Sequence, residues 1–307
     1  MFERLRQGGA APQNEALAAS PEQAMTAAKA ASAHLPELLV DAKRVAATVA
    51  AGWHGRRRPG PGETFWQFRP FDFGEPARRI DWRRSARDDT LLVREREWES
   101  AHTVYLWVDR SASMRACSKL AMQSKEDRAV VLTLALADLL GRGGERIGFL
   151  GGPPPAARRN AADRLAEHLA ETPAGDLPAS PQVRRSSDVV LVSDFLDPME
   201  HLAPTFQALA ASGCRAHLVQ VLDPVEERFP FGGRTRFVDP ESGLALLVGK
   251  AEAWRTSYQD TLAAHKAALA WEARRLGSGL ILHHTDHPAA PALLALRNAL
   301  AGERAAA

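Results

Sequence analysis

The chain has 307 residues, of which 45% are hydrophobic and 25% are charged. These proportions are typical of a globular protein with one large domain, or with one domain and an extension. Lysine and arginine together number 39 and the acids 37. The resulting net charge of +2 gives no overall reason to expect nucleic acid or an anionic membrane as the partner.

The two cysteines, Cys117 and Cys214, are far apart in the sequence and match no metal-ligand spacing. Residues 1–20 are rich in Ala, Gly, Gln and Pro, which predicts a flexible tail, and they lack the apolar segment of a signal peptide. The longest apolar stretch, from Ala129 to Leu140, contains a threonine and an aspartate and is too short to cross a bilayer. We therefore expect a cytoplasmic protein with no membrane insertion.

Two segments of different character follow the tail. Residues 21–51 are alanine-rich, and apolar side chains recur at intervals of three and four between Leu35 and Val49, which predicts an amphipathic helix that ends at Gly52. Residues 52–99 contain arginine but no lysine, together with many aromatic side chains. Arginine without lysine favours planar, bidentate pairing with carboxylates. Within this segment, TLLVREREWE at 90–99 predicts a strand.

From residue 103 onward, predicted strands alternate with predicted helices. Apolar runs predict strands at 103–109, 146–151, 188–195, 215–224 and 279–286. Helices are expected at 124–140, 157–171, 198–213, 250–276 and 289–301, and a hairpin at 234–248. The pattern predicts an α/β domain over residues 100–307, with a mostly parallel sheet and helices on both faces. The tail at 1–20 and a helix and arginine/aromatic block at 21–99 precede it, and we expect the helix and the block to pack onto the domain.

Oxygen-bearing side chains stand where two predicted strands end. In TVYLWVDRSASM, Asp109 ends an apolar run, and Ser111 and Ser113 follow at alternate positions. A second buried strand ends at Asp194. Ligands bind beyond the carboxyl ends of the strands in such sheets, and carboxylates with hydroxyls are hard donors that suit Mg²⁺ or Mn²⁺. An alternative without metal is that the two serines cap the following helix and Asp109 caps the loop.

The motif DRSAS resembles the D-x-S-x-S signature of von Willebrand factor A domains, whose metal-ion-dependent adhesion site (MIDAS) binds a divalent cation. The stretch before it, GRRRPGPGETFWQFRPFDFGEPARRIDW followed by RRSARDDTLLVREREWE, is similar to the DUF58 family. The resemblance runs from about residue 35 to the end of the chain. It implies a Rossmann-like von Willebrand factor A domain with an N-terminal helix and an arginine- and aromatic-rich extension.

The resemblance also implies a metal site. Ser111 and Ser113 would bind the cation directly, and Asp109 and Asp194 would bind it through water. The cation would be Mg²⁺, or else Mn²⁺ or Ca²⁺.

The sequence departs from the adhesion pattern in one place. Adhesion sites use a threonine from the loop between the two aspartates, where this chain has AETPAGDLPASP. Thr172 and Asp176 are the two oxygen-bearing candidates in that loop, and Asp176 stands where a Gly-Thr pair is more usual.

Members of the family are typically associated with MoxR-type AAA+ ATPases. The resemblance therefore implies a non-enzymatic adaptor, acting with such an ATPase in complex assembly or maturation. In this hypothesis the metal rim captures an acidic side chain of a partner protein.

Two other functions remain open on the sequence. A metal-assisted hydrolase would use Asp109 and Asp194 to hold Mg²⁺, although no nucleophile or general base is evident. Nucleic-acid binding would use the arginine-rich segment at 76–87, although neighbouring acids nearly cancel its charge. HHTDH at 283–287 invites a zinc interpretation, but two adjacent histidines on a strand point to opposite faces, and solvated loop histidines are the preferred interpretation.

Overall fold

The computed structural model describes residues 21–51, 65–72, 74–87, 90–96, 102–175, 177–178 and 181–302. The chain divides into two compact units, of which residues 53–102 form one and residues 1–52 with 103–307 form the other. The predicted tail at 1–20 lies outside the described residues. Among the described helices, none is both long enough and apolar enough to cross a membrane.

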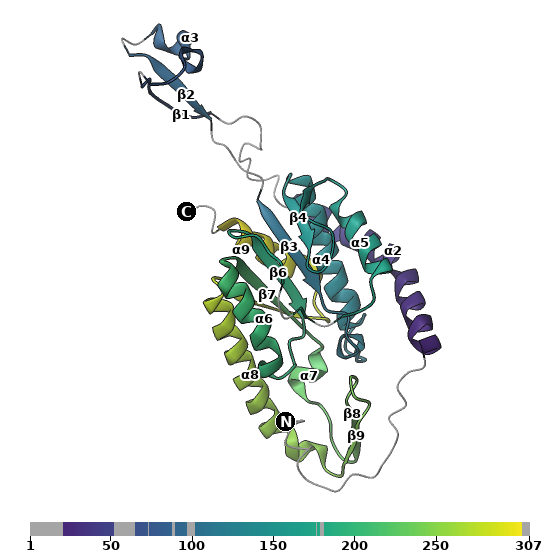
Figure 1. Ribbon diagram of the computed structural model, residues 1–307. Coiled ribbons are helices and arrows are strands. Elements are labelled where there is room, and N and C mark those ends of the chain that lie inside the picture. The colour runs from purple at the N-terminus through teal and green to yellow at the C-terminus, as the bar shows by residue number, and fades with distance from the viewer. Residues whose placement is uncertain are drawn as a thin grey trace. The chain divides into compact units, whose positions relative to one another are not determined.

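The larger unit is built on a six-stranded sheet with the order β10-β7-β6-β3-β4-β5. Figure 1 labels its central strands β7, β6, β3 and β4. All neighbouring strands are parallel except the short β5, which is antiparallel to β4. The strands are β3 (Thr103–Val108), β4 (Arg146–Phe149), β5 (Ala156–Ala157), β6 (Asp188–Ser193), β7 (Arg215–Leu222) and β10 (Leu280–His284). The predicted α/β class and mostly parallel sheet are therefore confirmed.

Helices cover both faces of this sheet. On one face lie α2 (Pro21–Ala51), α4 (Lys125–Arg142), α5 (Ala161–Glu171) and α9 (Ala289–Gly302). On the other lie α6 (Met199–Ser212) and α8 (Arg255–Arg275). Strand β3 supplies both cores, because its alternate side chains point to opposite faces: Val104 and Leu106 join the first core and Tyr105 the second.

Shorter elements surround the carboxyl ends of the strands. The single turn η2 (Ser113–Arg115) follows β3, and α7 (Pro224–Arg228) follows β7. An antiparallel hairpin of β8 (Thr235–Val238) and β9 (Ala245–Val248) then leads to η3 (Ala251–Trp254) and α8. The hairpin was predicted from the sequence, whereas α7 was not.

Helix α4 ends later than the sequence predicts. Its start is as expected, because Ser124 Oγ accepts from the Asp127 backbone N–H at 3.0 Å. It continues to Arg142 and is capped by Gly143, rather than ending at Leu140 before Gly141. Gly141 remains helical because the helix passes close to another segment there: a Cβ at this position would lie 2.8 Å from the Arg158 carbonyl oxygen. Gly141 therefore allows the close packing of the helix and does not end it.

The N-terminal helix α2 is part of the main hydrophobic core. Leu35, Leu38, Ala42, Ala46 and Val49 are buried in the same core as α4, α5 and α9. The small side chains let α2 lie close to its neighbours, and the three-and-four spacing predicted from the sequence is the buried stripe of the helix.

The smaller unit contains an antiparallel pair, β1 (Phe65–Pro70) and β2 (Leu92–Arg96), with η1 (Ala77–Arg79) and α3 (Trp82–Ser85) between them. The strand expected within 90–99 is thus confirmed. Asp81 caps α3 by accepting from the Arg84 backbone N–H at 3.0 Å, and the Arg84 guanidinium lies 5.7 Å from the Phe68 ring centroid. That the arginine/aromatic block packs on the sheet stays a prediction.

The packing of α2 makes it a stabilising element of the larger unit. Replacing Leu38 with Ala should lower the free energy of unfolding by about 2–5 kcal/mol, because it leaves a cavity in a packed core. Val40→Ala is the matched control, since Val40 is 61% exposed and such changes stay within about 0.5 kcal/mol. Urea denaturation followed by tryptophan fluorescence measures both. Equal effects of the two substitutions would contradict the packing of α2.

Candidate functional site

The strand order places a site at the carboxyl end of β3 and β6. The chain leaves β3 through α4 toward β4 on one side, and leaves β6 through α6 toward β7 on the other. Connections that diverge in this way open a crevice beyond the strand ends, where ligands of doubly wound sheets bind. Asp109 directly follows β3 and Asp194 directly follows β6, so the two predicted aspartates stand on either side of the point where these connections diverge.

Both strand ends make the same local turn. The Ser111 backbone N–H donates to Asp109 Oδ1 at 2.8 Å, and the Leu196 N–H donates to Asp194 Oδ1 at 3.1 Å. Aspartate favours this turn because its short side chain can accept from the backbone two residues later. The second oxygen of Asp109 accepts from Ser193 Oγ at 2.6 Å, which joins the two strand ends directly.

The two predicted serines join the same network. Ser113 Oγ donates to Asp194 Oδ2 at 3.0 Å, and Ser111 Oγ lies 3.1 Å from Ser113 Oγ. Asp109, Ser111, Ser113 and Asp194 are therefore brought together, as the motif predicts. We call these four residues the rim.

A lysine that the sequence analysis did not single out occupies the rim. Lys125, the first residue of α4, is 1% exposed. Its Nζ donates to Asp194 Oδ2 at 2.7 Å and to Glu226 Oε1 at 2.5 Å. Asp194 Oδ2 thus accepts from both the lysine and Ser113.

Glu226 is held in place by the end of β7. It closes a capping box on α7, in which Glu226 Oε2 accepts from the Asp223 N–H at 2.8 Å. Asp223 in turn accepts from the Ser118 N–H at 2.7 Å. Three neighbouring strands, β3, β6 and β7, therefore contribute acidic groups to one corner of the sheet.

A carboxylate from the hairpin reaches the rim from outside. Glu241, between β8 and β9, accepts from the Ser113 backbone N–H through Oε1 at 2.8 Å. The hairpin turn is itself fixed by Asp239, whose Oδ1 accepts from the Glu241 N–H at 3.1 Å. The Ser113 backbone N–H thus points away from the rim, and in this structure the carboxylate of Glu241 accepts its hydrogen bond.

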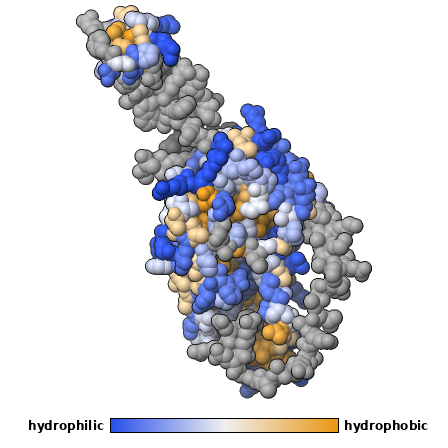
Figure 2. Space-filling view, in the orientation of Figure 1, coloured by the Kyte–Doolittle hydropathy of each residue, from blue (hydrophilic) through white to orange (hydrophobic). Residues whose placement is uncertain are grey.

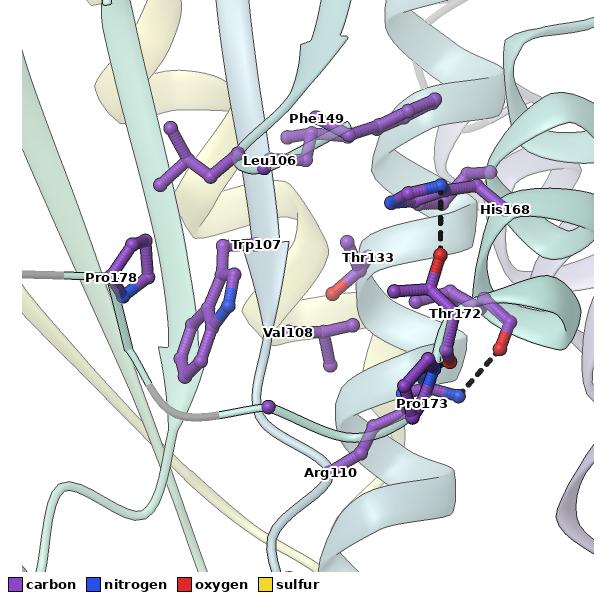
Figure 3. A pocket seen from close by; sticks show the side chains of 15 residues that line it. Leu106, Trp107, Val108, Arg110, Thr133, Phe149, His168, Thr172, Pro173 and Pro178 are labelled. Atoms are coloured by element: carbon purple, nitrogen blue, oxygen red, sulfur yellow. Dashed lines mark hydrogen bonds between the residues drawn. The ribbon is translucent and has the colours of Figure 1, made fainter. Parts of the chain in front are cut away.

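Of the two loop candidates, Thr172 does not join the rim. Thr172 lies at the end of α5 beside a pocket of about 170 Å³ (Figure 3), where its Oγ1 is 3.2 Å from His168 Nδ1. Arg110 holds this loop, because its guanidinium donates to the carbonyl oxygens of Leu169, at 2.6 Å, and of Thr172. Asp176 lies outside the described residues.

Burial governs the protonation of the groups around the rim. Burial raises the pKa of Asp109, although hydrogen bonds from Ser193 and Ser111 oppose the rise. Burial likewise raises the pKa of Glu226 against the opposing attraction of Lys125. For Lys125, burial lowers the pKa, but the two carboxylates outweigh it and the pKa is raised. The lysine therefore stays charged at neutral pH.

A model of the family described as "Protein of unknown function DUF58" matches residues 67–268. The chain belongs to the DUF58 family. Curated relatives include the uncharacterized proteins Rv1480 of Mycobacterium tuberculosis and Mb1516 of Mycobacterium bovis. Each is 30% identical to this member over 260 residues, which cover 78% of this chain and 80% of the relative.

Solved structures similar to this DUF58 chain include two from Bacteroides species. One is an aerotolerance-related membrane protein from Bacteroides fragilis, with a TM-score of 0.41 and 16% identity, covering 66% of this chain and 100% of that one. Another is the conserved hypothetical protein BatB from Bacteroides thetaiotaomicron, with a TM-score of 0.39 and 15% identity, covering 66% and 98%.

The rim of this DUF58 protein has the donor types of a magnesium site, but its carboxylates already interact with protein groups. Both carboxylate oxygens of Asp109 and both of Asp194 already accept hydrogen bonds. The Lys125 ammonium also donates to Asp194 Oδ2, the oxygen that accepts from Ser113 Oγ. Within the part of the chain that the structure describes, no group of three His, Cys, Asp or Glu residues is arranged to hold a metal. With the ammonium in this position, Asp194 Oδ2 has both of its lone pairs engaged and does not fit a divalent cation as a further partner.

Sequence patterns contained a signal for Lys125. A lysine at the first position of a helix stands against the helix dipole, which favours negative charge there. A lysine at such a position therefore indicates that acidic side chains lie close to it, and here these are Asp194 and Glu226. The sequence signal for Glu226 was weaker. The motif Asp-Pro-Val-Glu after a buried strand is typical of a helix start with a capping acid. Glu241 had no local signal, because only the fold brings the hairpin to the rim.

The histidines at 283–287 do not form a cluster of ligands. His283 is buried, and burial lowers its pKa to about 4. His284 Nε2 lies 2.6 Å from Glu227 Oε2 on α7, while His287 is exposed. The expectation of a solvated loop is wrong for His283, because the strand carries it into the interior.

Removing Asp194 should be costly. Asp194→Ala leaves the buried Lys125 with Glu226 alone, and breaking a buried pair in this way lowers the free energy of unfolding by about 3–5 kcal/mol. Asp41→Ala is the control, since the Asp41–Arg44 pair at 3.1 Å is exposed and contributes about 0–1 kcal/mol. Urea denaturation compares the variants. A cost for Asp194→Ala as small as that for Asp41→Ala would contradict the buried network.

Proposed function

We propose that this DUF58 protein is a non-enzymatic adaptor that binds an acidic side chain of a partner protein at the rim. The partner proposed is a MoxR-type AAA+ ATPase, and the process is the assembly or maturation of a complex. The finer fold assignment, a Rossmann-like von Willebrand factor A domain, belongs to the same proposal. The sheet order and the D-x-S-x-S rim support it.

The contact of Glu241 carries the proposal. This carboxylate lies 128 residues further along the chain than Ser113 and still accepts from its backbone N–H at 2.8 Å. Glu241 is exposed, and the hairpin holds it at the mouth of the rim. A carboxylate from a partner, presented on a similar turn, has the same donor available once Glu241 withdraws.

The hairpin offers a partner apolar contact beside this donor. Val238, Leu244 and Leu247 are 51%, 62% and 55% exposed. Figure 2 shows apolar surface at the end of the larger unit where the β8–β9 hairpin lies. Exposed apolar patches bordered by polar residues are typical of protein-binding surfaces, so one partner can contact the patch and the rim together.

The acids already at the site disfavour a further carboxylate unless a cation offsets part of their charge. Asp109, Asp194 and Glu226 lie close together, and two like charges 4 Å apart repel by roughly 4 kcal/mol at the effective dielectric of a protein surface. Lys125 donates to two of these acids. The divalent cation and the cytoplasmic location expected from the sequence stay predictions, and the binding step described here does not depend on either.

The remaining alternatives also stay predictions. A hydrolase would hold its metal with Asp109 and Asp194, and Asp194 Oδ2 here accepts from both Lys125 Nζ and Ser113 Oγ. Nucleic-acid binding would use Arg78, Arg79, Arg83 and Arg84 in the smaller unit, and no observation on the described residues favours it.

Glu241 should compete with the partner. Glu241→Ala frees the Ser113 N–H, and a hydrogen bond to a charged group contributes about 1.5–3 kcal/mol. We therefore expect the variant to bind a purified MoxR-type ATPase from the same organism roughly tenfold more tightly than wild type does. Biolayer interferometry with the full chain measures the change.

Two further variants complete this experiment. Ser113→Asp places a negative charge at the rim and should abolish binding, while Glu167→Ala, on the exposed face of α5, should leave it unchanged. Binding that none of the three substitutions alters would place the partner contact elsewhere and contradict the proposed rim mechanism.

A further inference from the structure

We infer that Lys125 is the resident cation of the rim and takes the place that a divalent metal ion occupies in adhesion sites. The inference deepens the proposed function, because it names the positive charge that lets the rim accept an acid. It also predicts that acid binding by this chain is independent of Mg²⁺.

The position of the ammonium is the first argument. Lys125 Nζ lies 2.7 Å from Asp194 Oδ2, and Ser113 Oγ donates to the same oxygen at 3.0 Å. The charge therefore lies close to Ser113, because the ammonium and the Ser113 hydroxyl donate to the same oxygen. The backbone N–H of Ser113 is the group that donates to the carboxylate of Glu241. A metal ion bound by Asp194 and Ser113 would occupy the same corner.

The second argument is that neighbouring protein groups hold the lysine and its acceptors in place. Lys125 is 1% exposed, and its second acceptor, Glu226, is fixed through its other oxygen by the Asp223 N–H at 2.8 Å. Asp223 is fixed in turn by Ser118 at 2.7 Å. The Lys125 backbone also donates to the Ala116 carbonyl oxygen at 3.2 Å, which ties the start of α4 to the loop after η2.

The third argument is competition for oxygens and charge. A divalent ion at Asp194 would have to displace the ammonium, whose long side chain is enclosed at the start of α4. It would also leave Glu226 without its cation. Lys125 instead supplies counter-charge to Asp194 and Glu226 through a side chain that cannot diffuse away.

Mn²⁺ titration followed by electron paramagnetic resonance tests the inference on the purified full chain. Wild type should bind no Mn²⁺ at millimolar concentration. Lys125→Met removes the charge but keeps the length of the side chain. This variant should gain Mn²⁺ affinity by more than about tenfold, because a positive charge beside the ion site is lost. Lys266→Met is the matched control, since Lys266 pairs with Glu227 outside the rim, and it should bind as wild type does.

Lys125→Gln provides a second variant if Lys125→Met does not fold, because its amide can still donate to Asp194. A gain of Mn²⁺ binding in either Lys125 variant that is absent from Lys266→Met supports the inference. If neither variant folds, the wild-type titration alone tests the role of Lys125, and absence of Mn²⁺ binding at millimolar concentration supports the inference. Micromolar Mn²⁺ binding by wild type that Ser111→Ala weakens overturns the inference.

The ATPase-binding assay separates this inference from the proposed function. Binding that Glu241→Ala strengthens and Ser113→Asp abolishes, but that disappears in EDTA, keeps the rim as the binding site and overturns the lysine mechanism. Absence of any rim-dependent binding overturns the proposed function, and the Mn²⁺ titration then decides the role of Lys125 alone.

Discussion

The buried network of Lys125, Asp194 and Glu226 is the constraint on which the rest of the site depends. It joins the start of α4, the end of β6 and the start of α7. Desolvating such charges costs several kcal/mol per ion, so they are tolerated only when each has partners. Here each group has a second contact, from Ser113 to Asp194 and from the Asp223 N–H to Glu226. The loops around the crevice are thereby held in one arrangement.

This arrangement explains why the rim presents donors outward. The carboxylates turn their oxygens toward serine hydroxyls, backbone N–H groups and the lysine, which leaves the Ser113 N–H facing the hairpin. The β8–β9 hairpin then covers the rim with Glu241 and exposes Leu244 and Leu247 beside it. A surface that combines an ionic contact with an apolar patch can give both orientation and affinity to a partner.

Periodicity in the sequence was a reliable guide to the elements but not to their ends. Runs of apolar residues gave β3, β6 and β7 because both faces of a parallel sheet are buried. The end of α4 was misplaced because Gly141 resembles a terminator, whereas its role is to let another segment approach. Ala156 and Ala157 form the edge strand β5. The sequence analysis did not predict this strand, because two residues are too few to show a periodic pattern.

The sequence by itself determined the α/β class, the family and the convergence of Asp109, Ser111, Ser113 and Asp194. These follow from local patterns, because parallel strands bring their carboxyl ends to one edge. Only the tertiary structure decided what completes the site. Lys125 and Glu226 approach Asp194 across 69 and 32 residues of chain, and Glu241 reaches Ser113 across 128. No local pattern encodes such distances, since they depend on how α4, α7 and the hairpin pack.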